Sequence, residues 1–359
     1  MQEITGLMVK RAKELLESGE VKRVVGWTTG DFLYDVTPAV FEKPEDLEEG
    51  KFVYNCFCGA NLSKYLIQIL RDEINKVNTA KAMASRKGEN PDDIPGPGKT
   101  LVFLKPCDTY SFNQLLTEHR IDKSLVYVIG IACRGMVDIE RIKLDGVTGI
   151  TKALDKGDKI EIKTVYGDKT YNRNDILLGK CSTCKGKELK YADEVIDPEP
   201  LPEGEGKGAM DRMAGVEMLE EMSSEERFAF WNEQLSRCIK CYACRNVCPA
   251  CSCIHCVFDN SKSGVASKAN VTEFEEKMYH IIRAFHVAGR CTDCGECSRV
   301  CPEQIPLHLL NRKFIKDINE FYGEYQAGEK EGQISPLTSF DADNDVEPSI
   351  VIEKGGDKK

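Results

Sequence analysis

Cysteine is the residue type with the greatest capacity for chemistry in this sequence. Of its 359 residues, 17 are cysteines; six lie before residue 190, and the other eleven lie between positions 238 and 301. In a chain without a secretion signal, such a density indicates metal binding or redox chemistry more than disulfides. The odd count also argues against a complete set of disulfides. The uneven distribution predicts two chemically distinct domains.

The later cysteines contain a repeated motif. The pattern Cys-x2-Cys-x2-Cys-x3-Cys-Pro occurs at residues 238–249 and again at 291–302. In two-cluster ferredoxins, the first three thiolates of such a run bind one 4Fe–4S cubane, whereas the fourth binds the other cluster. We therefore predict two 4Fe–4S clusters, one bound by Cys238, Cys241, Cys244 and Cys301 and the other by Cys291, Cys294, Cys297 and Cys248.

The alternative for these cysteines is a pair of structural zinc sites. Such sites usually consist of two well-separated Cys-x2-Cys pairs, which is not the spacing found here. Three more thiols, Cys251, Cys253 and Cys256, directly follow the first run. The sequence leaves open whether they contribute to a further cluster or are buried bystanders.

Four of the earlier cysteines could form a third site. Cys107 directly follows one predicted strand, Cys133 follows the next, and Cys181 and Cys184 form a Cys-x2-Cys pair. Thiols at the carboxyl ends of adjacent parallel strands converge on the ligand side of the sheet. Together the four would suffice for a third 4Fe–4S cluster, the alternative being ordinary buried cysteines. Spacing assigns no role to Cys56 and Cys58.

The elements around these cysteines predict an α/β domain over residues 1–195. Apolar periodicity predicts helices at 4–17 and 61–70, and a polar, Gly- and Pro-containing stretch predicts a loop at 78–99. A strand at 101–104, a helix at 110–120 and a strand at 125–131 imply a parallel pair with a right-handed crossover. Two shorter signals are a strand at 24–27 and a hairpin at 161–171.

The second half is predicted to be mainly helical. Residues 196–222 form a linker rich in Pro, Gly and Glu, and residues 223–322 form a ferredoxin domain. A capping box of Ser223 and Glu226 begins one helix, and a helix at about 271–288 leads into the second cysteine run. Residues 323–359 form an acidic, extended tail that we expect to order on another subunit. Its predicted anchors are Ile334, Leu337, Phe340, Ile350, Val351 and Ile352.

Composition excludes several classes of function. The net charge is −10, which disfavours nucleic-acid binding. The longest apolar stretch, Leu125 to Cys133, is far shorter than the roughly 20 residues of a membrane-spanning helix. The N-terminus lacks the apolar core of a signal peptide. We therefore expect a cytoplasmic protein that neither inserts into membranes nor binds nucleic acid.

Three segments of the first domain resemble a known family. LVFLKPCD, YVIGIACRG and KCSTCK followed by YADE look like the β subunits of coenzyme F420-reducing hydrogenases and formate dehydrogenases. The second cysteine run, HVAGRCTDCGECSRVCPEQIPL, is similar to the dicluster module fused to or paired with that family. The interval of 43 positions between the two runs resembles that in the helical ferredoxin domain of heterodisulfide reductases. The resemblance implies an iron–sulfur cluster beside an FAD, with Cys107, Cys133, Cys181 and Cys184 as the cluster ligands.

Flavin binding has two candidate segments. The family's N-terminal Gly-Gly…Thr flavin segment has no clear counterpart here, and the nearest residues are Thr28, Thr29 and Gly30. The turn containing Asn55, Gly59 and Asn61 precedes a predicted helix and could cradle a flavin phosphate. The same turn could equally be a helix cap.

These observations lead to two hypotheses. The first is an electron-transfer iron–sulfur flavoprotein subunit of a soluble anaerobic oxidoreductase complex. It would relay electrons between a hydrogenase, formate dehydrogenase or heterodisulfide-reductase-like partner and a two-electron carrier. The second is a flavin-free iron–sulfur subunit that only connects and docks its partners. No side chain is a candidate acid, base or nucleophile, and the sequence specifies neither the carrier nor the direction of electron flow.

Overall fold

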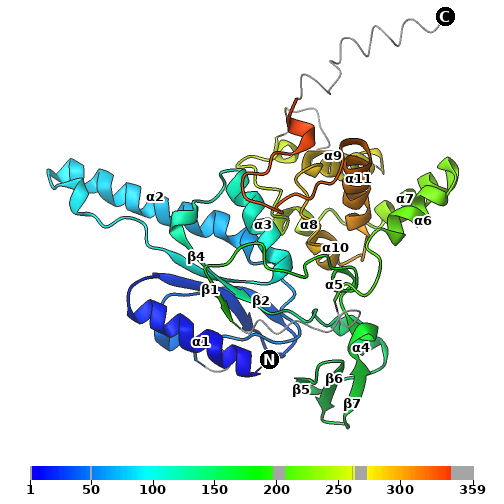
Figure 1. The fold of residues 1–359 in the computed structure, drawn as a ribbon, viewed down its shortest axis with the longest axis horizontal. Coiled ribbons are helices and arrows are strands. Elements are labelled where there is room, and N and C mark those ends of the chain that lie inside the picture. Colours follow the sequence, from blue (N-terminus) through cyan, green and yellow to red (C-terminus); the bar gives the residue numbers. More distant parts are fainter. Residues whose placement is uncertain (1, 49–50, 197–206, 261, 263–272, 341–359) are drawn as a thin grey trace, which may run out of the picture.

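A five-stranded sheet organises the first domain. The computed structural model describes residues 2–48, 51–196, 207–260, 262 and 273–340 (Figure 1). The strand order is β2-β1-β3-β4-β8, with the last four strands parallel and β2 antiparallel at one edge. Every residue of β3 is buried, as expected for a central parallel strand covered on both faces. The bounds are β1 Arg23–Thr29, β2 Val36–Phe41, β3 Thr100–Leu104, β4 Val126–Ile131 and β8 Glu194–Ile196.

Helices cover both faces of this sheet. Figure 1 shows α1 (Gln2–Glu17) on one side and α2 (Ser63–Lys87) and α3 (Pro106–Thr117) on the other. The core combines Met8 and Leu15 of α1 with Trp27, Phe103 and Leu66. The parallel β3–α3–β4 unit predicted from the sequence is confirmed, and with it the α/β character of the domain.

The predicted loop at 78–99 is wrong in its first half. The helix that was expected to end near residue 70 continues as α2 to Lys87, and Figure 1 shows this end extending away from the sheet. Ala84 is buried, and the helix packs against the short 3-10 turn η2 (Pro91–Asp93). Gly88, with a φ of +75°, then ends the helix. Polar residues with adequate helix propensity explain why the sequence pattern did not reveal this extension.

A small antiparallel sheet is inserted between β4 and β8. It has the order β5-β6-β7, and its β6–β7 pairing confirms the predicted hairpin. Its buried side chains, including Ile160 and Ile162, form a separate small core. The elements of this segment are α4 Ile139–Leu144, β5 Ile150–Asp155, β6 Lys159–Thr164, β7 Lys169–Asn172 and α5 Gly179–Ser182.

The second half is helical, as predicted. The Ser223–Glu226 capping box is present at the start of α7. Residues 197–206 of the predicted linker lie outside the described residues, but its later part contains α6, which packs against α11. The helices are α6 Ala214–Glu221, α7 Ser224–Ser236, α8 Ala243–Asn246, α9 Glu273–Val287, α10 Glu296–Arg299 and α11 Leu307–Tyr322. Among the described residues, no helix is long and apolar enough to cross a membrane.

The beginning of the predicted tail packs on its own chain. Tyr325 is buried and its hydroxyl donates to the Gly289 carbonyl at 2.8 Å. The Asn113 amide donates to the Gly328 carbonyl at 3.2 Å, which ties the segment to α3. Three predicted anchors, Ile334, Leu337 and Phe340, are exposed, whereas Ile350, Val351 and Ile352 lie outside the described residues.

Candidate iron–sulfur sites

The four cysteines predicted for the first domain lie together at the carboxyl edge of the sheet. Cys107 follows β3 as the second residue of α3, and Cys133 follows β4. Cys107 is hydrogen-bonded to Cys184, and Cys181 interacts electrostatically with both Cys107 and Cys133. Burial raises the pKa of the Cys181 thiol to about 12. Such a thiol becomes a thiolate at neutral pH only when a cation compensates its charge.

Backbone amides surround these sulfur atoms as donors. The N–H of Gly135 donates to Cys133 Sγ at 3.4 Å, that of Met136 to Cys181 Sγ at 3.3 Å, and that of Gly186 to Cys184 Sγ at 3.3 Å. Hydrogen bonds to sulfur are a main means of stabilising thiolate ligands and setting cluster potentials. The donor set therefore fits a 4Fe–4S cluster.

Gly186 has a second role at this site. A Cβ atom at this position would lie 2.7 Å from the backbone nitrogen of Cys107, closer than real Cβ contacts allow. The loop carrying Cys184 thus approaches Cys107 only because residue 186 has no side chain.

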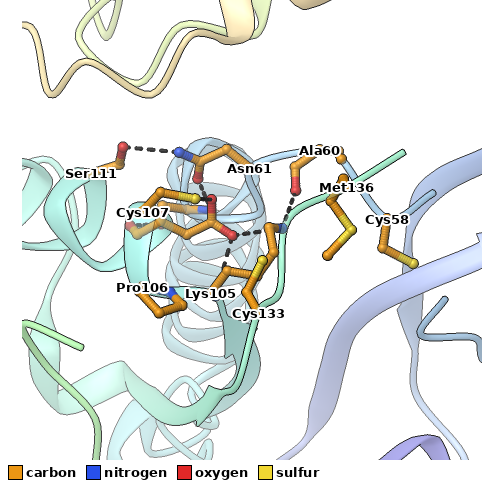
Figure 2. Close-up of polar contacts among 12 residues, drawn as sticks. Cys58, Ala60, Asn61, Lys105, Pro106, Cys107, Ser111, Cys133 and Met136 are labelled. Atoms are coloured by element: carbon orange, nitrogen blue, oxygen red, sulfur yellow. Dashed lines mark hydrogen bonds and ion pairs between the residues drawn. The ribbon is translucent and has the colours of Figure 1, made fainter. Parts of the chain in front are cut away.

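A fifth thiol, which sequence reasoning left unassigned, lies beside this group. Cys58 is fully buried, its sulfur accepts from the Asn55 N–H at 3.2 Å, and it interacts electrostatically with Cys133. Figure 2 shows it beside Met136. Cys56, two residues earlier, packs instead in the core of the small sheet. Spacing in the sequence gave no signal for this difference, because it depends on how one turn is packed.

A buried ion pair lies next to Cys107. Lys105 is 1% exposed, and its Nζ lies 2.8 Å from Asp108 Oδ2 and donates to the Ala60 carbonyl at 2.8 Å (Figure 2). The same ammonium lies 4.4 Å from the centre of the Trp27 ring. Nothing in the residues around Lys105 in the sequence indicated this position. Its positive charge would offset part of the negative charge of a thiolate-bound cluster.

In the second domain, cysteines from the two repeats share two pockets. One pocket is lined by Cys248 together with Cys291, Cys294 and Cys297. The other is lined by Cys301 together with Cys238, Cys241 and Cys244. These are the two groups of four that the crossed ligation pattern predicts. Their binding of iron stays a prediction.

The backbone around the two pockets repeats with the sequence. Lys240 and Tyr242 have φ values of +51° and +59°, and the equivalent Asp293 and Gly295 have +49° and +68°. Left-handed backbone at non-glycine residues is uncommon and concentrates at ligand-binding turns. Both cysteine runs therefore wrap around their pockets by the same alternation of backbone conformation.

Each pocket has polar neighbours that contact its sulfur atoms. His280 Nε2 lies 3.2 Å from Cys238 Sγ, and the Asn311 amide donates to Cys297 Sγ at 3.8 Å. Cys251 is hydrogen-bonded to Cys248, which lowers the pKa of Cys248 to about 5. Of the other unassigned thiols, Cys256 packs near Cys238, whereas Cys253 is exposed.

The cysteine groups that the structure describes are not arranged to bind a single metal ion. Within the part of the chain that the structure describes, no group of three or more His, Cys, Asp or Glu side chains could hold one metal ion. In a cubane each thiolate binds a different iron, so its ligand sulfurs need not converge on a single point.

The pocket lined by Cys291, Cys294, Cys297 and Cys248 lies directly against the first domain. The Ser111 and Thr292 hydroxyls are hydrogen-bonded at 2.9 Å. Lys180, next to Cys181 in sequence, forms a buried ion pair with Glu296 between Cys294 and Cys297. Lys185 donates to the Thr292 carbonyl and interacts electrostatically with both Cys184 and Cys291. The first-domain cysteines and this pocket are therefore neighbours.

The candidate flavin residues have local structural roles. Thr28 and Thr29 pair with β2, and the Gly30 N–H donates to the Asp35 carbonyl at 2.7 Å in the turn that follows. The Asn55 side chain accepts from the Phe57 N–H at 2.8 Å.

The second half of the candidate turn behaves in the same way. The Gly59 N–H donates to the Phe57 carbonyl at 2.7 Å. Asn61 is 1% exposed, and its oxygen accepts from the Ser63 N–H at 3.0 Å at the start of α2. Leu62 occupies the N-cap position of α2, so the Asn61 side chain binds the first N–H of the helix from one residue upstream of the cap.

Comparison with known proteins gives one matching domain family and two related formate dehydrogenase subunits. Residues 234–305 match the 4Fe-4S dicluster domain family. The chain is 23% identical to the F420-dependent formate dehydrogenase subunit beta of Methanocaldococcus jannaschii, over 88% of this chain and 89% of the relative. It is 26% identical to the F420-dependent formate dehydrogenase 1 subunit beta of Methanococcus maripaludis, over 71% and 74%.

A solved structure also gives a partial match. A chain of the F420-reducing [NiFe] hydrogenase complex from Methanosarcina barkeri aligns with 51% of this chain and 62% of its own length, with 14% identity and a TM-score of 0.34.

Proposed function

We propose, from the confirmed similarity of most of this chain to F420-dependent formate dehydrogenase β subunits and from its 4Fe–4S dicluster domain, that it is an electron-transfer subunit of an oxidoreductase complex. The observation that carries the proposal is the pair of pockets, each lined by three cysteines of one repeat and the fourth cysteine of the other. This arrangement suits two adjacent cubanes.

The proposed ligands comprise three sets of four cysteines. The N–H donors at the first-domain sulfurs and the repeated left-handed turns support these assignments. The clusters supply one-electron redox chemistry, and the chain holds them, excludes water and sets their electrostatic surroundings. The sets are Cys107, Cys133, Cys181 and Cys184; Cys248, Cys291, Cys294 and Cys297; and Cys238, Cys241, Cys244 and Cys301.

The three sets define an order of relay. The first-domain set neighbours the Cys291 pocket through Lys185, and Cys297 of that pocket interacts electrostatically with Cys244 of the other. With clusters bound by these cysteines, electrons would pass from one end set to the other through the Cys291 pocket. The Cys238 pocket is the terminal one, with Cys241 and Ile239 exposed at the surface. This surface is where a redox partner would exchange electrons.

The relatives suggest the chemistry at the two ends of the relay. One end would receive or deliver electrons at a formate dehydrogenase or hydrogenase catalytic subunit. The other would exchange two electrons with F420, through an FAD beside the first-domain cysteines. The satisfied side chain of Asn61 favours a second candidate, a flavin-free subunit that relays single electrons only.

Cofactor analysis of anaerobically purified protein tests the proposal. We expect about twelve iron atoms per chain, four per cluster, with an equal amount of sulfide. A content of about eight iron atoms would show that the first-domain cysteines bind no cluster. Zinc in place of iron would refute the proposal. Extractable FAD with F420 reduction distinguishes the two candidates, because the relay-only subunit would contain neither flavin nor this activity.

A further inference from the structure

A buried arginine lies between the two pockets of the ferredoxin domain. Arg283 belongs to α9 and is 3% exposed, and its Nη2 donates to the Cys244 carbonyl at 3.1 Å. Its Nε has no hydrogen-bond partner, and the strongest electrostatic neighbours of the guanidinium among the described residues are thiols rather than carboxylates. A positive charge is thus buried without a negative side chain nearby.

Other buried arginines of this protein are paired. Arg23 contacts Glu73 at 2.5 Å, and Arg312 contacts Asp293 at 2.8 Å. A buried charge without a counter-charge costs several kcal/mol. Because Ile281 and Phe285 of the same helix are exposed, α9 also has solvent-facing positions on which a cation would avoid this cost. The inward position of Arg283 therefore calls for a partner that the amino-acid side chains do not provide.

The immediate surroundings of Arg283 are thiols from both cysteine groups. Its guanidinium interacts electrostatically with Cys244 of one pocket and with Cys248 and Cys297 of the other. A cubane with four thiolate ligands is anionic and becomes more negative when it is reduced. The missing negative charge would therefore be present on both sides of Arg283 once the clusters are bound.

We propose that Arg283 is a positioning residue for electron transfer, whose fixed charge stabilises the reduced forms of both ferredoxin clusters. This inference rests on the proposed function. A positive charge near a cluster favours addition of an electron, so its removal makes reduction harder. Because one guanidinium lies between both pockets, its loss shifts both clusters in the same direction, toward lower potential.

Redox titration of the full chain, monitored by electron paramagnetic resonance, tests this inference. Arg283→Gln removes the charge but retains a donor for the Cys244 carbonyl. We expect the reduction equilibria of both ferredoxin clusters to shift at least tenfold, about 59 mV for one electron, and that of the first-domain cluster to stay unchanged. Arg283→Lys keeps the charge and should retain potentials near those of the wild type. Arg23→Gln is the control for losing a buried arginine distant from these pockets.

The outcomes separate this inference from the proposed function. Wild-type potentials in an iron-replete Arg283→Gln protein would overturn the inference and leave the relay intact. If Arg283→Gln does not retain its clusters, Arg283→Lys decides: wild-type potentials support the role of the charge, and lowered potentials in both clusters overturn it. Absence of two ferredoxin clusters from the wild-type protein would refute the proposed function itself.

Discussion

Glu296→Gln removes the negative charge that the buried Lys180 ammonium and the partly exposed Arg299 guanidinium share where the domains meet. The Glu296 carboxylate is 1% exposed, forms an ion pair with Lys180 of the first domain, and accepts from Arg299 at 2.7 and 2.8 Å. Lys180 also donates to the Gly59 carbonyl at 2.6 Å, and Oε2 accepts from the Asn61 N–H at 3.3 Å. The substitution keeps the shape of the side chain but leaves two positive charges without their common partner.

The expected cost is about 3–5 kcal/mol, the usual range for removing one member of a buried ion pair. We expect a value near the lower limit, since the glutamine oxygen still accepts one hydrogen bond and the Lys180 side chain keeps the Gly59 carbonyl. At about 1.4 kcal/mol per tenfold, 3 kcal/mol corresponds to a roughly 150-fold change in the equilibrium for opening this contact.

Amide hydrogen exchange of the anaerobic, cluster-loaded protein measures that opening. The N–H groups of Arg299 and Val300, which donate to the Gly295 and Glu296 carbonyls, should exchange about 100-fold faster or more in Glu296→Gln. Glu320→Gln, an exposed change on α11, is the matched control and should alter exchange by less than about threefold.

The stability of the wild-type contact depends on pH through the Glu296 carboxylate. Burial alone would raise the pKa of Glu296, but Lys180 and Arg299 hold it below its usual value overall. A carboxylate with a depressed pKa contributes its full stability above the unfolded value of about 4.3 and loses it as the pH falls through the folded value. The difference in the free energy of opening between the wild-type protein and Glu296→Gln should therefore be constant from pH 6 to 9. Exchange within threefold of wild type at pH 7 would refute the assignment of this carboxylate as the shared partner of both cations.

Three further predictions concern the clusters and the tail. Cys301→Ser should alter the paramagnetic signal of the cluster bound by the first cysteine run, and a change confined to the other cluster would disprove the crossed ligation. Gly186→Ala should displace Cys107 and lower the iron content from about twelve to about eight atoms, whereas Gly179→Ala, which has open space around it, should retain all iron. Deleting residues 330–359 removes the exposed Leu337 and should reduce co-purification with partner subunits, and unchanged assembly would contradict a docking role.

The sequence predicted those features whose signals are local. The buried apolar run at 101–104 in β3 and the helix that follows it are specified by consecutive residues, and so is the capping box at Ser223. The grouping of cysteines between repeats was also predictable, because the spacing of each run restricts how its turns can wrap. The length of α2 was not predictable in this way, since its stability depends on packing against η2.

Features that depend on tertiary contacts have no recognisable pattern in the amino-acid sequence. Cys58 and Cys56 are separated by one residue, yet one lies beside the first-domain cysteines and the other in a different core. Lys105 and Arg283 are ordinary charged residues in the sequence, and only burial beside thiols distinguishes them. Spacing motifs thus identify the ligands of a cluster more readily than the charges that tune it.

The contact between the domains would also limit how electrons move in the proposed relay. The Cys291 pocket lies against the first domain, whereas the Cys238 pocket contacts solvent through Cys241. The tail is hydrogen-bonded to both domains: Tyr325 donates to Gly289 of the ferredoxin domain, and Gly328 accepts from α3 of the first domain. The tail therefore stabilises the contact between the domains. A ferredoxin domain that detached would break the proposed relay between the first-domain cysteines and the Cys291 pocket, and it would expose Lys180 and Glu296 to water. In the proposed relay the two domains would therefore act as one electron-transfer unit, with the Cys238 pocket open to a redox partner through the exposed Cys241.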